Sequence, residues 1–352
     1  MTDLVPGGIS FFSQRHGWSC DTVQEFEVVL ANSSIVRATE NSNADLFWAL
    51  RGGGANFGVV TSVSVDVFPQ GPSWYNFQLF NLGDIKSVMQ RLDYLTRNMP
   101  TDLQMIATNL AWSPWRKEFV LSDRIVSLSE NVMETMQMDT NAYDPCLDTP
   151  LPAEEHLYRR TTFEMAQVMD IVNEDGFFNF FGSMTVKSGV EINLIVADIF
   201  QEEASKITNI PGIQVYIVYN PLTTPTIKKM TRRGGNTLRI QETDGPLTII
   251  NFNMRWSQDA DTTRMREFLR RTLRRVKDAS EKTGTDHPYL FLNHCYEEQT
   301  PLLSYGAENI KRLHRIREDL DPDGVFQTLK VGQHKLGRQY QDAVSWSGKT
   351  EL

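Results

Sequence analysis

The stretch that decides the fold is ADLFWALRGGGANFGVVTSVSVDVFP, which covers Ala44–Pro69. Residues Asp45–Leu50 are predicted to form a short helix, and Val59–Val67 alternates like a β-strand. The glycines between them partly match a dinucleotide fingerprint. That fingerprint needs a strand before the glycine turn and a helix after it, so that the pyrophosphate meets the helix N-terminus. The order here is reversed, which excludes a dinucleotide site of the Rossmann type. The glycines must therefore have another role.

Length and composition bound the class of protein. With 352 residues the chain has room for about two domains, and its 40% hydrophobic content is enough for packed cores. A net charge of −9 argues against a nucleic-acid partner, which would require a basic face. The densest basic run, Arg266–Lys282, has apolar residues at helical spacing, so its arginines are predicted to form a solvated helix face.

The sequence has no clear targeting signal and no metal-binding motif. The three cysteines are too scattered for a disulfide framework, and no His or Cys motif predicts a metal site. No run approaches the roughly 18 apolar residues of a membrane helix, and the first residues lack a signal-peptide pattern. The sequence therefore predicts a cytoplasmic protein without a membrane partner.

Two patterns alternate along the chain. Residues 1–70 are rich in strands and contain a predicted hairpin, Gln24–Ala31 with Ile35–Ala38. From residue 71 to residue 287, strands alternate with longer helices, which predicts an antiparallel sheet of about five or six strands covered by helices on one face. Residues 288–352 form a C-terminal segment with a different, motif-like character. The predicted class is α+β.

Four stretches together carry a family resemblance: Gly7–Asn32, Asn43–Thr61, Tyr219–Leu238 (YNPLTTP and RRGGNTL) and the tail from Tyr289, YLFLNHCYEEQTPLLSYG. They resemble the berberine-bridge-enzyme-like flavin oxidoreductases, the fungal branch in particular. The most specific is the helix ending in DLFWALRGGG and leading into NFGVVT. The resemblance implies that residues 1–70 are the C-terminal half of a PCMH/VAO-type FAD-binding domain. Residues 71–287 would be the substrate domain, and residues 288–352 would return to the FAD-binding domain.

The resemblance also gives the glycine turn a role. In the family this turn brings main-chain amides to the diphosphate of FAD. Glycines lack Cβ, so backbone N–H groups can surround anionic oxygens; the alternative is a tight turn without a ligand. The cofactor-binding residues implied are Gly7, Gly8, Gly53, Gly54, Asn56, Gly58, Val59 and Asn293.

An N-terminal half of the flavin domain, which carries the family's covalent attachment histidine, is expected to be missing. FAD is therefore expected to bind non-covalently. Strand edges left without that half favour association, so a homo-oligomer or a partner chain is predicted to cover this face.

Catalysis in the family is hydride transfer to flavin, assisted by a base. Where the family tail commonly reads Asn-Tyr-Ala, this chain has Asn293-His294-Cys295. Histidine titrates near neutral pH, so His294 is the predicted catalytic base. The alternative is a packed histidine that fills a tyrosine-shaped space.

Substrate contacts are expected from the second domain. The run FFNFF, Phe177–Phe181, puts two rings on each face of a strand, where they either line an apolar cavity or pack in the core. The predicted substrate-binding residues are Phe178, Phe180, Tyr216 and Tyr219. Asn220 stands where the family usually has Gln.

The predicted function is that of an FAD-dependent oxidoreductase acting on a small apolar secondary metabolite. Two alternatives remain. One is a flavin-free remnant of the fold that acts as a non-redox isomerase or cyclase. The other is an inactive fragment or interaction subunit.

Overall fold

The computed structural model describes residues 5, 7–100, 102–128, 154–171, 175–329 and 334–337. The chain folds as two compact units. Unit 1 combines residues 1–68, 225–243 and 288–352, and unit 2 combines residues 69–224 and 244–287. The sequence analysis placed residues 225–243 in the domain 71–287. They fold with unit 1 instead, because a buried arginine of unit 1 binds their backbone carbonyls.

Unit 1 contains a three-stranded antiparallel sheet in the order β2-β1-β3. Its strands are β1 (Val23–Val29), β2 (Ile35–Ala38) and β3 (Val59–Val65). The hairpin of β1 and β2 confirms the prediction from the turn residues between them. Phe26 and Val28 of β1 are completely buried, so this small sheet has a core of its own.

The predicted short helix is α2 (Ala44–Leu50), in which every residue from Leu46 to Leu50 is buried. It packs on α9 (Ala307–Leu320), where the Arg312 guanidinium lies 4.0 Å above the Trp48 ring and pairs with Asp45. The shorter helices of this part of the chain are α1 (Ser13–His16), η1 (Ser19–Thr22), α7 (Thr224–Lys229), η3 (Arg232–Gly234), η4 (Glu242–Asp244), η6 (Leu292–His294), η7 (Pro301–Tyr305) and α10 (Val325–Thr328).

Unit 2 is built on an eight-stranded antiparallel sheet in the order β11-β8-β10-β9-β5-β6-β4-β7. The strands are β4 (Ser73–Phe80), β5 (Leu103–Ser113), β6 (Glu118–Ser127), β7 (Glu154–Arg160), β8 (Phe178–Lys187), β9 (Gln214–Leu222), β10 (Leu247–Trp256) and β11 (Asp286–His287). The antiparallel prediction is confirmed, but the sheet is larger than expected. Strand β7 is a polar edge strand, and its sequence did not predict a strand. Strand β11 has only two residues.

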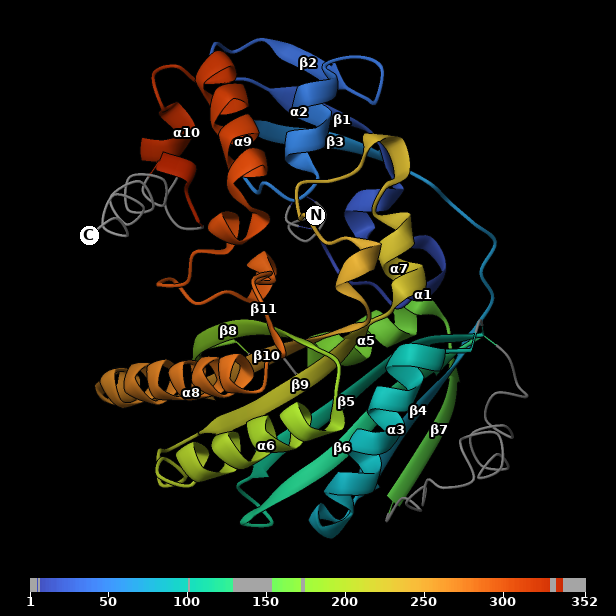
Figure 1. Ribbon diagram of the computed structural model, residues 1–352, viewed down its shortest axis with the longest axis vertical. Coiled ribbons are helices and arrows are strands. Elements are labelled where there is room, and N and C mark those ends of the chain that lie inside the picture. The colour runs from blue at the N-terminus through green and yellow to red at the C-terminus, as the bar shows by residue number, and fades with distance from the viewer. Residues whose placement is uncertain are drawn as a thin grey trace. The chain divides into compact units, whose positions relative to one another are not determined.

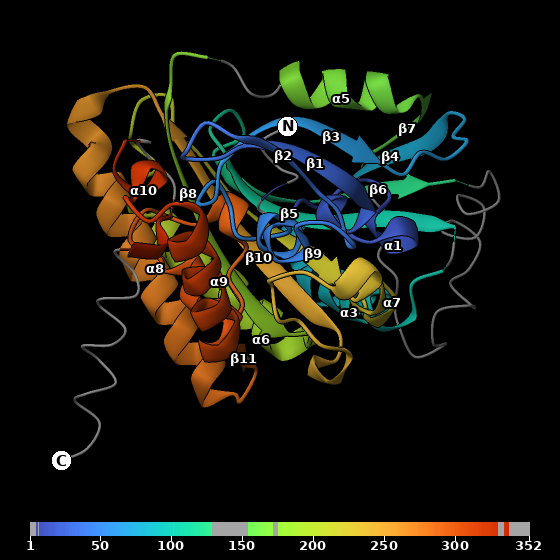
Figure 2. The same cartoon turned by 90° about the horizontal axis from the view of Figure 1, so that it is seen from above.

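Three helices cover one face of this sheet: α3 (Ile85–Asn98), α6 (Val190–Ala204) and α8 (Thr262–Lys282), which lie side by side in Figure 1. Figure 2 shows α6 and α8 along the same side of β8, β9 and β10. A further helix, α5 (Thr162–Ile171), contacts β7, and two single turns, η2 (Leu82–Asp84) and η5 (Asp259–Asp261), precede α3 and α8. The α+β class and the one-sided helix layer are as predicted.

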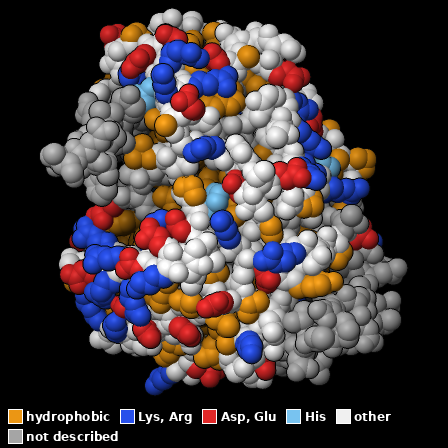
Figure 3. All heavy atoms as spheres, viewed as in Figure 1, with side chains coloured by type: hydrophobic (Ala, Val, Ile, Leu, Met, Phe, Trp, Pro, Cys, Tyr) orange, Lys and Arg blue, Asp and Glu red, His pale blue; other side chains and the backbone are white. Residues whose placement is uncertain are grey.

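Helix α8 turns its apolar stripe inward. Met265, Phe268, Leu269 and Val276 are buried. Basic side chains cover the outer surface, interspersed with acidic ones in Figure 3. This confirms the solvated-face interpretation of the run Arg266–Lys282.

A single buried carboxylate ties α6 to α8. Glu203 is 2% exposed and accepts hydrogen bonds from Lys206 at 2.8 Å, Arg271 at 3.0 Å and Arg275 at 2.8 Å. Burial alone would raise the pKa of Glu203. The hydrogen bonds from these three cations outweigh it and lower the pKa to about 2.

We expect Glu203→Gln to lower the free energy of unfolding at pH 7 by about 1–3 kcal/mol. The pKa of Glu203 in the folded state, about 2, lies below its ordinary value of 4.5. The carboxylate therefore stabilises the fold above pH 4.5, and this contribution is lost as the pH falls toward 2. Urea unfolding at several pH values measures the difference. Glu202→Gln is the control, because Glu202 also pairs with Arg275 but its side chain is 60% exposed. A pH-independent difference, or equal effects of the two variants, would contradict this account.

Candidate cofactor site

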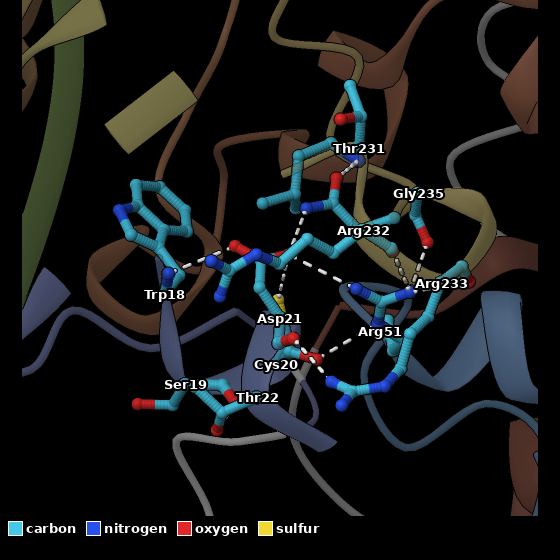
Figure 4. A network of polar contacts seen from close by, with 12 residues as sticks. Trp18, Ser19, Cys20, Asp21, Thr22, Arg51, Thr231, Arg232, Arg233 and Gly235 are labelled. Atoms are coloured by element: carbon cyan, nitrogen blue, oxygen red, sulfur yellow. Dashed lines mark hydrogen bonds and ion pairs between the residues drawn. The ribbon is translucent and has the colours of Figure 1, made fainter. Parts of the chain in front are cut away.

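The glycine turn begins at a completely buried arginine, Arg51, which directly follows α2. Its Nε donates to the Cys20 carbonyl at 2.9 Å (Figure 4). Its Nη1 donates to three further backbone carbonyls, those of Arg232 at 3.0 Å, Arg233 at 3.1 Å and Gly235 at 2.6 Å. One guanidinium thus joins the start of the glycine turn to two segments that are distant in the sequence.

The counter-charge of Arg51 is Asp21, which is also completely buried. Its Oδ1 accepts hydrogen bonds from Arg51 Nη2 at 3.3 Å and Asn236 Nδ2 at 2.8 Å, and its Oδ2 accepts one from the Trp18 N–H at 2.9 Å. Burial raises the pKa of Asp21 and lowers the pKa of Arg51, while each group's charge opposes the shift of the other. Removing either partner would therefore leave an uncompensated buried charge.

The first two glycine amides of the turn are used within the fold. Gly52 N–H donates to the Val5 carbonyl at 2.8 Å, and Gly53 N–H donates to the Ala49 carbonyl at 2.9 Å. A Cβ on Gly53 would overlap the Ala49 carbonyl oxygen and lie 2.7 Å from the Phe57 ring. The prediction that Gly53 offers its amide to a cofactor is wrong, because this amide caps the end of α2.

The next position is different. Gly54 has a left-handed backbone, with φ of 67°, and a Cβ built there would meet nothing nearer than 3.8 Å. The N–H groups of Gly54 and Ala55 have no acceptor among the described residues. Amides without an acceptor in a left-handed turn form the kind of nest that binds an anionic oxygen. The residues present therefore fit a phosphate group at Gly54 and Ala55 rather than at Gly53.

The Asn56 side chain makes its hydrogen bonds within the fold. Its Nδ2 donates to the Gly53 carbonyl at 2.8 Å and to the His334 carbonyl at 3.3 Å, and its Oδ1 accepts from Leu336 N–H at 3.4 Å. The side chain is completely buried, so it clamps the turn to the tail rather than facing a ligand.

Gly58 and Val59 serve β3. A Cβ on Gly58 would lie 2.5 Å from Val28 Cγ1 and 2.9 Å from the Val29 carbonyl oxygen, so close strand packing requires glycine. Val59 begins β3 and is 54% exposed.

Gly7 and Gly8 belong to the same assembly. Their carbonyls accept the N–H groups of Cys20 at 2.9 Å and Ser19 at 2.8 Å. Both glycines have positive φ, 123° and 84°. The loop that carries them is thereby attached to the segment of Asp21, the partner of Arg51.

The tail reaches the glycine turn as the resemblance implied. Tyr305 Oη donates to the Gly52 carbonyl at 2.9 Å, and the Cβ position of Gly54 lies 3.9 Å from Leu292 Cδ1. Asn293 and His294 form η6, a 3-10 turn, together with Leu292. The half-buried His294 ring stands edge-on to Phe291, with ring centroids 5.4 Å apart.

Three of the four predicted substrate residues face the helices. Phe178 and Phe180 contact the Trp256 ring, at 5.8 and 4.8 Å between centroids, and Phe180 also lies 5.7 Å from the Arg266 guanidinium of α8. Tyr219 is completely buried and donates to the Asn193 carbonyl of α6. All three lie on the side of the sheet that the helices cover, where Tyr219 is buried and Phe178 is 42% exposed. Their contacts are with residues of the fold, so the structure does not support the prediction for them. Alternation defines two faces, but not which of them the helices cover.

The remaining one, Tyr216, lies on the opposite face of the sheet. It alternates along β9 with Ile217 and Tyr219, which face the helices. Burial raises the pKa of its hydroxyl.

Sequence reasoning missed Arg51, Asp21 and Ala55. The signal for the pair lay in the quoted stretches, since a charged residue directly before a glycine run is a candidate anchor. Its partner, 30 residues away, is found only in three dimensions.

Within the described ranges, no cluster of three or more His, Cys, Asp or Glu side chains is placed to hold a metal ion. None of the described helices combines the length and apolar character needed to cross a membrane.

Comparison with known proteins points to one group. No protein-family model matches the chain. It is 30% identical over 352 residues to the FAD-dependent monooxygenase tpcD of Cochliobolus heterostrophus, covering 95% of this chain and 65% of that protein. It is 28% identical over 355 residues to the FAD-dependent monooxygenase elcE of Phaeosphaeria nodorum, covering 96% of this chain and 99% of that protein. The chain thus spans just under two thirds of the first relative's length.

Solved structures share the fold. The 6-hydroxy-D-nicotine oxidase of Arthrobacter nicotinovorans superposes with a TM-score of 0.71 at 18% identity, covering 92% of this chain and 69% of that one. Physcomitrella patens BBE-like 1 gives 0.68 at 18% identity, covering 94% and 70%. The resemblance found in the sequence is confirmed: the chain is related to fungal proteins named FAD-dependent monooxygenases and has the fold of the berberine-bridge-enzyme-like FAD-linked oxidoreductases.

We expect Arg51→Met to lower the free energy of unfolding by about 3–5 kcal/mol, because it leaves Asp21 buried and unpaired and frees four backbone carbonyls. Denaturant unfolding measures the loss. Arg37→Met is the matched control, since the Arg37 side chain is 70% exposed and its pair with Glu25 spans 3.8 Å; a change below about 0.5 kcal/mol is expected there. Similar losses in the two variants would show that the buried network is not what holds unit 1 together.

Proposed function

We propose that the chain binds FAD at the glycine turn and acts as an FAD-dependent oxidoreductase. The observation that carries the proposal is the pair of amides at Gly54 and Ala55, which have no acceptor among the described residues. The names of the fungal relatives support the choice of cofactor.

Each residue then has a defined task. FAD, when bound, supplies a hydride acceptor for a carbon atom of the substrate. Gly54 and Ala55 would bind a phosphate oxygen, while Arg51 and Asp21 keep the turn in shape. His294, two residues after Leu292, is the group proposed to take a proton from the substrate, since imidazole exchanges protons near neutral pH.

The partners stay predictions of the sequence: a small-molecule substrate, and a second copy or a partner chain on the N-terminal face. The cytoplasmic location also stays a prediction of the sequence.

An absorbance spectrum of the purified chain, dialysed against FAD, tests the proposal. Bound flavin gives a band near ~450 nm that remains with the protein after the free cofactor is removed. A protein that stays colourless, with all FAD recovered in the dialysate, would overturn the proposal. Colourless protein with catalytic activity would favour the non-redox alternative.

Gly54→Ala tests the location of the site. The new methyl group has room but enters the space proposed for the phosphate, and the left-handed backbone costs about 1 kcal/mol. We expect the variant to fold and its Kd for FAD to rise at least about tenfold. Gly284→Ala is the control, with φ of 66° and nothing within 4 Å of its Cβ position. Equal FAD affinities in the two variants would place the cofactor elsewhere.

A further inference from the structure

The segment His334–Leu336, called here the strap, is fastened to the glycine turn by its main chain. The His334 carbonyl accepts a hydrogen bond from Asn56 Nδ2 at 3.3 Å, and the Leu336 N–H donates to Asn56 Oδ1 at 3.4 Å. Asn56 is completely buried and Leu336 is 1% exposed, so the anchor point of the strap is shielded from solvent.

Two further contacts hold the strap beside α10. Lys335 Nζ donates to the Phe326 carbonyl at 2.8 Å, and Gln327 Nε2 donates to the Asn56 carbonyl at 3.2 Å. None of these contacts uses the imidazole of His334. The backbone position of His334 is therefore set independently of its ring.

The imidazole of His334 makes a separate contact, with the residue that follows His294. It donates a hydrogen bond to the Cys295 carbonyl. Burial lowers the pKa of His334, and this hydrogen bond opposes the shift only in part, so the ring is neutral at pH 7. A neutral imidazole has one N–H donor and one acceptor nitrogen, so the contact also determines which nitrogen carries the proton.

The turn that carries His294 has few hydrogen bonds of its own. In η6 the His294 N–H donates to the Phe291 carbonyl at 2.9 Å, and the Cys295 N–H donates to the Leu292 carbonyl at 3.3 Å. A single 3-10 turn is too short to be stable by itself. The geometry of η6 therefore depends on the contacts at its ends.

The peptide group between Cys295 and Tyr296, at the end of η6, is held from both sides. Its carbonyl accepts the hydrogen bond from His334, and its N–H donates to Gln299 Oε1 at 3.0 Å. Gln299 lies three residues away in the same loop, whereas His334 belongs to the strap. Of these two contacts, only the one from His334 ties η6 to a segment that is anchored elsewhere.

The position of a general base decides how well it works. Proton transfer needs heavy atoms about 2.6–3.2 Å apart, and a displacement of about 1 Å can cost about 10²-fold in rate. The ring of His294 is half-buried and stands edge-on to Phe291, so a rotation of η6 would move it. A base of this kind requires support from residues that are themselves fixed.

We infer that His334 is a positioning residue for His294, acting through the Cys295 carbonyl from a strap that is anchored at Asn56. The inference rests on the proposed function, in which His294 takes a proton from the substrate. The main chain of the strap serves the glycine turn, and the imidazole of His334 serves the turn of the base.

The rate at which diethyl pyrocarbonate modifies each histidine, read by peptide mass spectrometry, tests this inference. His334→Phe keeps a ring but removes the donor. We expect His294 to react about three- to tenfold faster in this variant, because the loss of one hydrogen bond frees η6. His314, which is 8% exposed on α9, should keep its rate in the same sample. His334→Gln and His334→Asn return an N–H near the places of Nε2 and Nδ1, and one of them should restore the slow rate.

His16→Phe is the matched control. His16 is another half-buried histidine of unit 1, and its ring stacks on Phe68 with centroids 3.9 Å apart, which a phenyl ring can also do. This variant should leave the rate at His294 unchanged. Thermal unfolding checks that each protein is folded, and His334→Leu replaces His334→Phe if the latter is not.

The inference is overturned if the donor-free variant leaves the His294 rate unchanged, if His314 accelerates equally, or if neither amide variant restores the slow rate. FAD titration of the same samples keeps the two proposals apart. The bonds to Asn56 do not use the imidazole, so His334→Phe should change the Kd for FAD by less than about twofold. Absence of FAD binding in every protein would refute the cofactor proposal alone. FAD binding with an unchanged rate at His294 would refute this inference alone.

Discussion

The buried ion pair of Arg51 and Asp21 is the interaction on which unit 1 depends. Neither side chain is accessible to solvent. The hydrogen bonds that the guanidinium donates go to backbone carbonyls and to Asp21. A buried pair of this kind adds little net stability compared with an apolar pair, but removing one partner is very costly. Its effect is therefore to fix geometry, since only one arrangement of the three segments satisfies both charges.

That constraint explains why adjacent glycines have different roles. Arg51 stands directly before the turn, so its fixed position sets the path of the backbone that follows. Gly53 is needed because the chain passes close to the end of α2, whereas the Cβ position of Gly54 meets nothing nearer than 3.8 Å and its amide has no acceptor among the described residues. A glycine run can thus combine a packing requirement with a binding surface within two residues. The tail completes the arrangement through the bond from Tyr305 to the Gly52 carbonyl.

Much of the fold followed from sequence patterns, because alternation, helical spacing and turn residues act locally. The hairpin of β1 and β2, helix α2 and the antiparallel pairing of β5 with β6 were all predictable in this way. Strand β7 was not, since it is polar and takes its form from pairing with β4. The site was less predictable than the fold. Which face of β8 is covered by helices depends on tertiary packing, and so does the use of an amide such as that of Gly53.

The central claim is that the Arg51–Asp21 pair holds the turn so that the amides of Gly54 and Ala55, and not that of Gly53, meet an anionic ligand. Amide NMR spectra of protein labelled with ¹⁵N at glycine and alanine, recorded during titration with ADP as the diphosphate half of FAD, test it most directly. The account predicts large, saturable shifts of the Gly54 and Ala55 resonances while the Gly53 resonance stays near its starting position. Shifts as large at Gly53, or none at Gly54 and Ala55, would contradict it.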